Sequence, residues 1–194
     1  MNRRRNQLEP PGAGLPWVER SFLDFGLKFS SSWLSKQRAL KLFLKDADTI
    51  IGLVREQAPE TVARKYMIPR MVGIEDSSRN WSVLMVIQHL NMANRAMLEI
   101  ITALVEDRRP QIDVSIADLK PPEMVDRLVV EDFQLLNQEI EAFVNNQEDL
   151  RTEETHPHPW FGELHGHLWL CLAAAHQRIH RRQCRKILTM IGVL

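Results

Sequence analysis

Four long stretches of this sequence space their apolar residues three or four positions apart, and segments rich in proline and glycine separate them. A helix turns about every 3.6 residues, so this spacing lines one face of each stretch with apolar side chains. Such faces must be buried against one another. Nowhere do apolar and polar residues alternate between turn signals as they do in a half-buried strand. The pattern predicts an all-α fold, a four-helix bundle.

Local signals place the ends of the predicted helices, which span about residues 36–58, 82–106, 123–145 and 164–191. Pro59 ends the first helix, and Ser82 is a good N-cap for the second. Pro121 and Pro122 suit the first turn of the third helix. Gly192 is placed to end the fourth.

The first part of the chain reads differently, and we expect residues 1–35 to be a partly disordered extension of a bundle formed by residues 36–194. Residues 1–16 are rich in Arg, Pro and Gly, which predicts a mobile arm. Residues 17–34 carry Phe22, Phe25 and Phe29 at helical spacing, which predicts a short helix.

Charge and hydropathy exclude two kinds of partner. The 25 Lys and Arg residues balance the 25 Asp and Glu residues, so no overall field attracts a nucleic-acid backbone. The longest apolar run, residues 168–175, has eight residues, whereas a helix needs roughly 20 to cross a bilayer. We therefore expect no nucleic acid and no membrane as partner.

The cysteines and the first residues favour a cytoplasmic location. Cys171 and Cys184 lie 13 positions apart in one predicted helix, so their backbones are roughly 20 Å apart and cannot be bridged. The arginines at positions 3–5 resemble the start of an export signal, but residues 9–14 hold prolines and glycines where an apolar stretch should be. A reducing, cytoplasmic setting is the expectation.

Two histidines of the fourth predicted helix lie in an apolar row. Every fourth residue there reads Leu164, Leu168, Leu172, His176, His180, Cys184, Leu188. A row spaced by four drifts only about 40° per step, so both rings point toward whatever the leucines pack against. This is the spacing of a two-histidine metal clamp. His89 has apolar neighbours three and four residues away, so it too is expected to point inward.

Three inward imidazoles need partners, because an unpaired buried polar group costs roughly 1 to 3 kcal/mol. Each histidine alone is usually a core residue with an ordinary hydrogen bond. One metal ion that accepts nitrogens from His89, His176 and His180 meets the need of all three. The other histidines, His156, His158, His165 and His167, lie among prolines and glycines and are expected to be exposed or locally hydrogen-bonded, not ligands.

These residues resemble the DinB-like superfamily. Its members open the second helix with Trp-Ser, place a histidine about two turns later, and carry a His-x-x-x-His pair in the fourth helix. The corresponding residues here are Trp81 and Ser82, His89, and the pair His176 and His180. The stretch 158–164 also resembles the entry to the last helix in one branch of the superfamily. The resemblance covers about residues 36–192.

The resemblance implies an up-down-down-up bundle in which the three histidines hold a divalent transition metal: zinc, nickel or iron. It also implies a class of activity, transfer of a low-molecular-weight thiol to an electrophilic substrate or thiol-dependent isomerisation. Association of two copies as a homodimer is left open. The superfamily's link with DNA damage concerns expression and implies no DNA binding.

Three nitrogen ligands leave a fourth position for water, thiol or substrate, so chemistry is expected at the metal. Cys184 continues the histidine row and could close the site, although a small buried core residue is the favoured interpretation. Asp132 has leucine and valine neighbours on the third helix, which makes it a weak candidate for a catalytic base or a partner of a ligand imidazole. For Asp132, a position at the rim of the helix face with its carboxylate in water is favoured.

Other functions remain as alternatives or are excluded. The alternatives are a non-enzymatic helical protein with a structural metal ion, and a metal-dependent hydrolase. A ferritin-like di-iron protein needs two Glu-x-x-His pairs on helices, and the one pair here, Glu153 and His156, precedes Pro157 in a polar segment. His-Glu-x-x-His, phosphate-loop and Gly-x-Ser-x-Gly motifs are absent.

Overall fold

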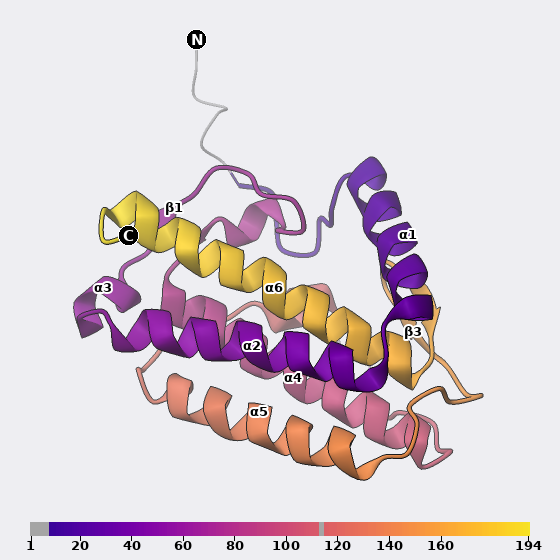
Figure 1. The fold of residues 1–194 in the computed structure, drawn as a ribbon. Coiled ribbons are helices and arrows are strands. Elements are labelled where there is room, and N and C mark those ends of the chain that lie inside the picture. Colours follow the sequence, from indigo (N-terminus) through magenta and orange to yellow (C-terminus); the bar gives the residue numbers. More distant parts are fainter. Residues whose placement is uncertain (1–7, 113–114) are drawn as a thin grey trace.

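The computed structural model describes residues 8–112 and 115–194, and most of this part of the chain is helical (Figure 1). Its long helices are α1 (Trp17–Trp33), α2 (Lys36–Arg55), α4 (Val83–Val105), α5 (Val129–Asn146) and α6 (Gly166–Ile191). The connections hold the short helices α3 (Pro59–Ala63), η2 (Asp76–Ser78) and η3 (Ile116–Leu119). Helices α2, α4, α5 and α6 form the predicted four-helix bundle.

The four bundle helices run up, down, down, up. Figure 1 shows α2 and α6 pointing one way and α4 and α5 pointing the other. A long connection, residues 106–128, returns the chain from the end of α4 to the start of α5. Ion pairs join the parallel neighbours: Arg95 of α4 lies 2.7 Å from Glu139 of α5, and Arg181 of α6 lies 2.9 Å from Asp46 of α2.

Local signals place two helix ends correctly. The hydroxyl of Ser82 accepts a hydrogen bond from Met85 N and caps α4, as the sequence predicts. Gly192 ends α6 in the left-handed region at φ 89°, a conformation that glycine adopts without strain. These signals act within one turn of the helix, so they can be read from the sequence.

Two predicted helix starts are wrong. α5 begins at Val129 rather than just after Pro122, and the preceding turn is held by the Asp126 carboxylate, which accepts a hydrogen bond from Leu128 N. α6 begins at Gly166 rather than Leu164, because the residues before it form a strand. A Cβ at position 166 would lie 2.8 Å from the carbonyl oxygen of Leu150, so only glycine fits where α6 starts.

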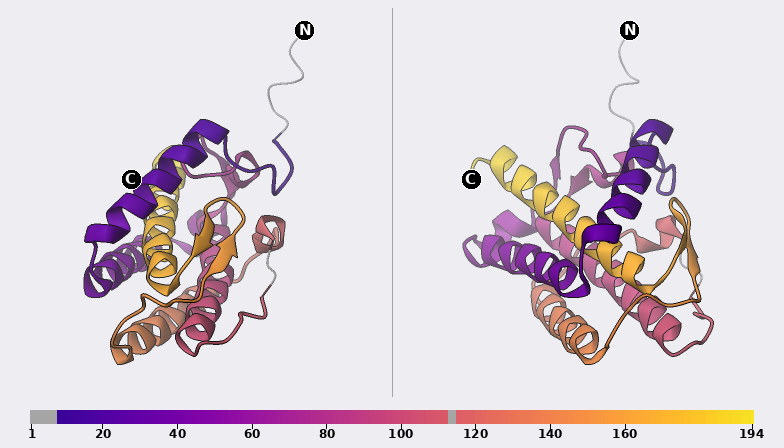
Figure 2. Two further views of the ribbon diagram at one scale, coloured as in Figure 1. Left: turned by 90° about the vertical axis from the view of Figure 1, so that its right-hand side faces the viewer. Right: turned by 45° about the vertical axis from the view of Figure 1, so that its right-hand side comes forward.

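Two small antiparallel sheets, absent from the prediction, brace the connections. β1 (Tyr66–Met67) pairs with β2 (Asn80–Trp81), and β3 (His156–His158) pairs with β4 (Gly162–Leu164). Each strand has two or three residues, too few to show the alternation that marks a strand in sequence. The β3–β4 hairpin lies on the same side of the bundle as α1 (Figure 2).

The predicted short helix near the start of the chain is α1, which packs on α6. Residues 8–16 differ from the predicted mobile arm, because the Glu75 carboxylate accepts hydrogen bonds from the backbone of Gly12 and Gly14. The first seven residues of that arm lie outside the described chain. The outer face of α1 exposes five large aromatic side chains: Trp17, Phe22, Phe25, Phe29 and Trp33.

A polar layer divides the apolar core of the bundle in two. On α6, one apolar cluster ends at Ala174 and the other begins at Cys184. On α4, the clusters meet between Leu90 and Ala93. The polar side chains gathered between the clusters are His89, Asn94, His176, Gln177, His180 and Gln183. The three predicted metal ligands, His89, His176 and His180, belong to this layer. The two weaker candidates, Asp132 and Cys184, lie outside it.

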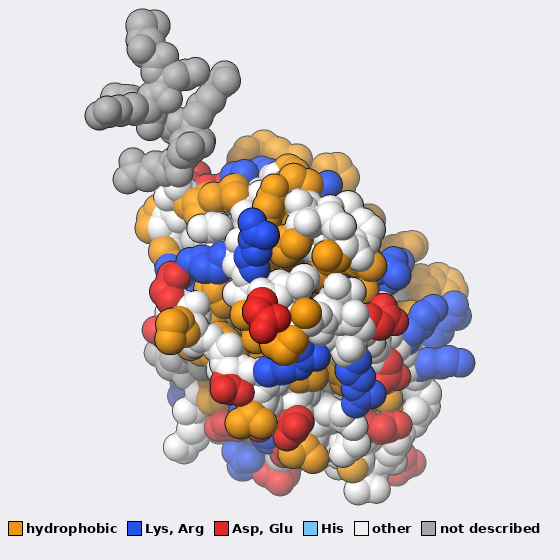
Figure 3. Space-filling view, turned by 90° about the vertical axis from the view of Figure 1, so that its left-hand side faces the viewer, with side chains coloured by type: hydrophobic (Ala, Val, Ile, Leu, Met, Phe, Trp, Pro, Cys, Tyr) orange, Lys and Arg blue, Asp and Glu red, His pale blue; other side chains and the backbone are white. Residues whose placement is uncertain are grey.

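The surface is mixed in charge. On the end of the molecule seen in Figure 3, cationic and anionic side chains are interspersed rather than gathered by sign. None of the described helices is long and apolar enough to cross a membrane.

Candidate metal centre

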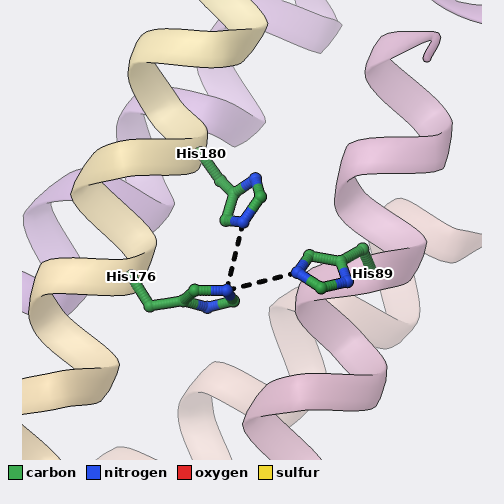
Figure 4. A group of neighbouring side chains, drawn as sticks. All are labelled: His89, His176 and His180. Atoms are coloured by element: carbon green, nitrogen blue, oxygen red, sulfur yellow. Dashed lines mark hydrogen bonds between the residues drawn. The ribbon is translucent and has the colours of Figure 1, made fainter. Parts of the chain in front are cut away.

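Three histidines from two antiparallel helices meet inside the polar layer (Figure 4). Nε2 of His176 lies 3.2 Å from Nε2 of His89 and 3.1 Å from Nε2 of His180. The row on α6 brings His176 and His180 together, with ring centroids 4.4 Å apart, and His89 of α4 faces both. The structure thus brings the three predicted residues together, with one ring nitrogen of each lying within 4.8 Å of the others.

The tautomer of His180 is set by Gln183. The carbonyl oxygen of Ser78 can only accept, so the Gln183 amide Nε2 donates to it, at 2.8 Å. The other atom of the amide, Oε1, therefore faces Nδ1 of His180 at 2.7 Å and must accept from it. His180 carries its hydrogen on Nδ1, and its Nε2 presents a lone pair to the centre.

The tautomer of His89 is set in the same way by a backbone group. Nδ1 of His89 lies 2.8 Å from the carbonyl oxygen of Leu119, at the end of η3, and donates a hydrogen bond to it. Its Nε2 is left with a lone pair that faces His176. Metal-binding histidines are commonly oriented by such hydrogen bonds from the nitrogen that does not bind the metal.

The third histidine cannot satisfy both neighbours by itself. A neutral His176 has one ring hydrogen, which on Nε2 would serve only one of the two facing lone pairs. Nδ1 of His176 has no hydrogen-bond partner among the described residues. A cation between the three Nε2 atoms would accept all three lone pairs. Two nitrogens bound to one zinc ion at about 2.0–2.1 Å, with tetrahedral angles, lie about 3.3 Å apart, close to the spacing of His176 and its neighbours.

Burial keeps the three imidazoles neutral. Desolvation lowers the pKa of His176 well below its usual 6.5, and the nearby His180 and His89 lower it further. The pKa of His180 is lowered well below 6.5 by desolvation and by His89. Desolvation also lowers the pKa of His89. Neutral imidazole is the form that binds a metal, so the donor set fits a divalent ion at neutral pH.

A cavity of about 350 Å³ opens onto the three histidines. Its walls come from the segment before α1, from α1, from residues 73–81 with η2 and β2, and from α4, η3, α6 and the β3–β4 hairpin. The rings of Trp81 and His89 are 5.3 Å apart at the same wall. The volume lies within the range of roughly 300–1,000 Å³ that is usual for small-molecule sites. A ligand in this cavity could reach the open side of a metal held by the three histidines.

The two weaker candidates lie elsewhere. Asp132 is exposed, because the side of α5 that faces the core is formed by Val129, Phe133 and Leu136. None of the described residues of α5 lines the cavity. Cys184 is fully buried in the second apolar cluster, and desolvation raises the pKa of its thiol to about 12. Its surroundings are those of the core residue that the sequence favours.

The four other histidines lie outside the three-histidine group, although not all are exposed. His165 caps α6 by accepting from Leu168 N. His167 is buried, and its Nε2 donates to the carbonyl oxygen of Leu34. His158 lines the cavity, where desolvation lowers its pKa to about 4. His156 is half-buried in β3.

Sequence reasoning missed three parts of the site: Gln183, Leu119 and His158. Gln183 had a readable signal, because it follows His180 by three residues and so shares its face of α6. Leu119 acts through its backbone, and His158 reaches the cavity only because the β3–β4 hairpin folds toward α6. Neither of these leaves a pattern in the sequence.

Comparison with known proteins supports the fold and leaves the function open. No protein-family model matches this sequence, and no curated protein matches it. A solved structure described as TT2238, a four-helix bundle protein, aligns with a TM-score of 0.52 and 22% identity, covering 78% of this chain and 98% of that one. At this identity the likeness concerns the fold alone.

Proposed function

We propose that this chain is a DinB-like, metal-dependent enzyme in which His89, His176 and His180 hold one zinc, nickel or iron ion. In this proposal the ion activates a low-molecular-weight thiol for transfer to an electrophilic substrate. The observation that carries it is the convergence of three Nε2 atoms, two of them with tautomers set by Leu119 and Gln183, at the wall of a ligand-sized cavity.

When bound, the ion would lower the pKa of a coordinated thiol so that the thiolate is present at neutral pH. The chain's own residues have positioning roles. Gln183 and the Leu119 carbonyl hold two imidazoles with their lone pairs toward the centre. The apolar walls exclude water, which would compete with the thiolate for the electrophile.

The alternatives fit less well. A structural ion needs no adjoining cavity, yet here a cavity of about 350 Å³ reaches the histidines. A hydrolase commonly uses a general base beside its metal-bound water. Apart from the three histidines of the proposed centre, two described cavity-lining residues could act as a base, Glu75 and His158. Both oxygens of Glu75 already accept hydrogen bonds, and desolvation lowers the pKa of His158 to about 4, which makes it a weak base. A coordinated thiolate needs no such base.

The test is spectroscopic. Protein without a histidine tag is loaded with cobalt and titrated with glutathione, bacillithiol and mycothiol. We expect an intense near-ultraviolet band from a sulfur-to-cobalt bond with at least one thiol, and loss of that band in His176→Ala. If cobalt binds and none of the three thiols gives the band, thiol activation is refuted. If the band persists in His176→Ala, the thiol meets cobalt outside the three-histidine site.

A further inference from the structure

Beyond the histidines, the described lining of the cavity is mostly apolar, with three serines and two charged side chains. Leucines, aromatic rings and small side chains cover most of it, among them Leu15, Leu27, Met97, Trp160, Phe161 and Leu172. Two charged side chains are part of the described lining, Glu75 and Lys120. Whether these two side chains are free to pair with a ligand decides whether the cavity can hold a charged group.

Both carboxylate oxygens of Glu75 are already engaged by the chain. Its Oε1 accepts from Gly14 N at 2.8 Å, and its Oε2 accepts from Gly12 N and from the Ser77 hydroxyl, both at 3.3 Å. Lys120 is exposed, so its ammonium group lies in solvent at the mouth. Inside the metal-free cavity, the groups free to meet a ligand are neutral, among them the Trp81 indole N–H, which has no hydrogen-bond partner among the described residues. A charged ligand group there would lose its hydration without meeting an opposite charge, which is strongly unfavourable.

Helix α1 forms one wall of this cavity and leaves a gap in it. Phe22, Gly26 and Ser30 are spaced by four on the helix, and all three line the cavity. Gly26 contributes no side chain at the centre of this row. A Cβ built on Gly26 would meet nothing within 4 Å. Free space therefore lies beside Gly26, which is exposed at this wall and which a larger side chain would fill.

We propose that the cavity binds an uncharged, apolar molecule about the size of a two- or three-ring aromatic compound, which enters beside Gly26. As the electrophile of the proposed thiol transfer, such a molecule would place its reactive carbon toward the three histidines, so this part of the inference rests on the proposed function. The charged groups of a cellular thiol would stay at the mouth near Lys120, and only its sulfur would reach the metal.

Two fluorescent probes that share their rings and differ by one sulfonate test the ligand class. N-phenyl-1-naphthylamine is neutral, and 1-anilinonaphthalene-8-sulfonate is anionic. Each is titrated against the metal-free protein, and binding is followed by fluorescence. We expect one neutral probe per chain, bound at least tenfold more tightly than the anionic one. Equal or stronger binding of the anionic probe would overturn the proposal.

Variants at two glycines test the route. Gly26→Trp should fill the gap and weaken binding of the neutral probe at least tenfold, while Gly26→Ala should change it less than twofold. Gly52→Trp is the matched control, because Gly52 also has open space around its Cβ but lies on α2, away from the cavity. Gly26→Leu serves if the Trp variant does not fold. Binding that survives both large substitutions at Gly26 would show that the probe binds elsewhere, for example on the exposed aromatic face of α1.

The same samples separate this inference from the proposed function. Cobalt added to Gly26→Trp should still give the spectrum of the three-histidine centre, because no ligand is changed. A normal cobalt–thiol band together with no binding of the neutral probe refutes the apolar ligand and leaves thiol activation standing. Tight, Gly26-dependent binding of the probe without any cobalt centre refutes the metal proposal and supports the ligand class.

Discussion

The buried amide of Gln183 orients one of the three imidazoles, and the variant Gln183→Leu tests how much the centre depends on it. Leucine is close in size to glutamine and apolar, so it suits a side chain with no exposed surface. The substitution removes the acceptor that holds Nδ1 of His180 and the donor that meets the Ser78 carbonyl. Nothing else in the three-histidine group is altered.

The expected losses follow from these two hydrogen bonds. Removal of an orienting partner typically lowers metal affinity about 10- to 100-fold, which corresponds to about 1.4 to 2.7 kcal/mol. The metal-free protein should also lose stability, because the His180 N–H and the Ser78 carbonyl are both left buried without a partner. Each such group costs about 1 to 3 kcal/mol.

Competition with a chromophoric chelator measures the zinc affinity, and urea unfolding measures the free energy of unfolding. Gln177→Leu is the matched control, since Gln177 is equally buried on α6 but bonds to Asn94 rather than to a histidine. It should lose stability and keep its zinc affinity within about threefold. Gln183 does not orient the metal ligand His180 if Gln183→Leu binds zinc as tightly as the unmodified protein, or if both variants lose the same affinity.

Three further predictions concern the histidines. Replacing His89, His176 or His180 with Ala should each end stoichiometric zinc binding, as measured by elemental analysis after reconstitution, and full retention in any one variant would contradict the triad. Single Ala substitutions at the four histidines of residues 156–167 should keep the metal, and loss in one of them would point to a further ligand. Stability should also depend on pH, because desolvation lowers the folded-state pKa of His158 to about 4 from 6.5. Between those values the unfolded chain binds a proton that the folded chain does not, so the free energy of unfolding falls as the pH is lowered, by about 3 kcal/mol for this group. Urea unfolding of metal-free protein at pH 7 and pH 4.5 measures the fall, which should be smaller in His158→Phe; equal falls in both proteins would contradict the assignment.

The fold could be predicted where a local signal decides it. The Ser82 cap and the Gly192 stop are such signals, and the apolar spacing within each of the four long stretches identified the bundle. The start of α5 could not be predicted, because Pro121 and Pro122 are compatible with a helix and only the turn at Asp126 delays it. The short strands could not be predicted for a different reason. Each has only two or three residues and depends on pairing with another segment of the chain.

Only part of the candidate site could be predicted from the sequence as well. The inward direction of His176 and His180 follows from their place in an apolar row, and that of His89 from its apolar neighbours. The exposed side chain of Asp132 agrees with the position at the rim that the sequence favours, and its neighbour Leu135 is exposed as well. The cavity could not be predicted, since it forms where many separate segments between Pro11 and His180 enclose a space and Gly26 of α1 contributes no side chain.

The two hydrogen bonds that orient His89 and His180 are encoded in different ways, and this difference governs how related sequences can vary. The contact to His180 depends on the identity of a side chain, so it is lost when position 183 mutates to a residue without an amide. The contact to His89 depends on a backbone carbonyl, so almost any residue at position 119 supplies it. An insertion or deletion in the connection from residue 106 to residue 128 would displace that carbonyl even with every neighbouring side chain retained. Relatives that keep this centre should therefore hold the length of that connection constant while residue 119 varies among apolar side chains, since Leu119 also lines the cavity and packs against the core.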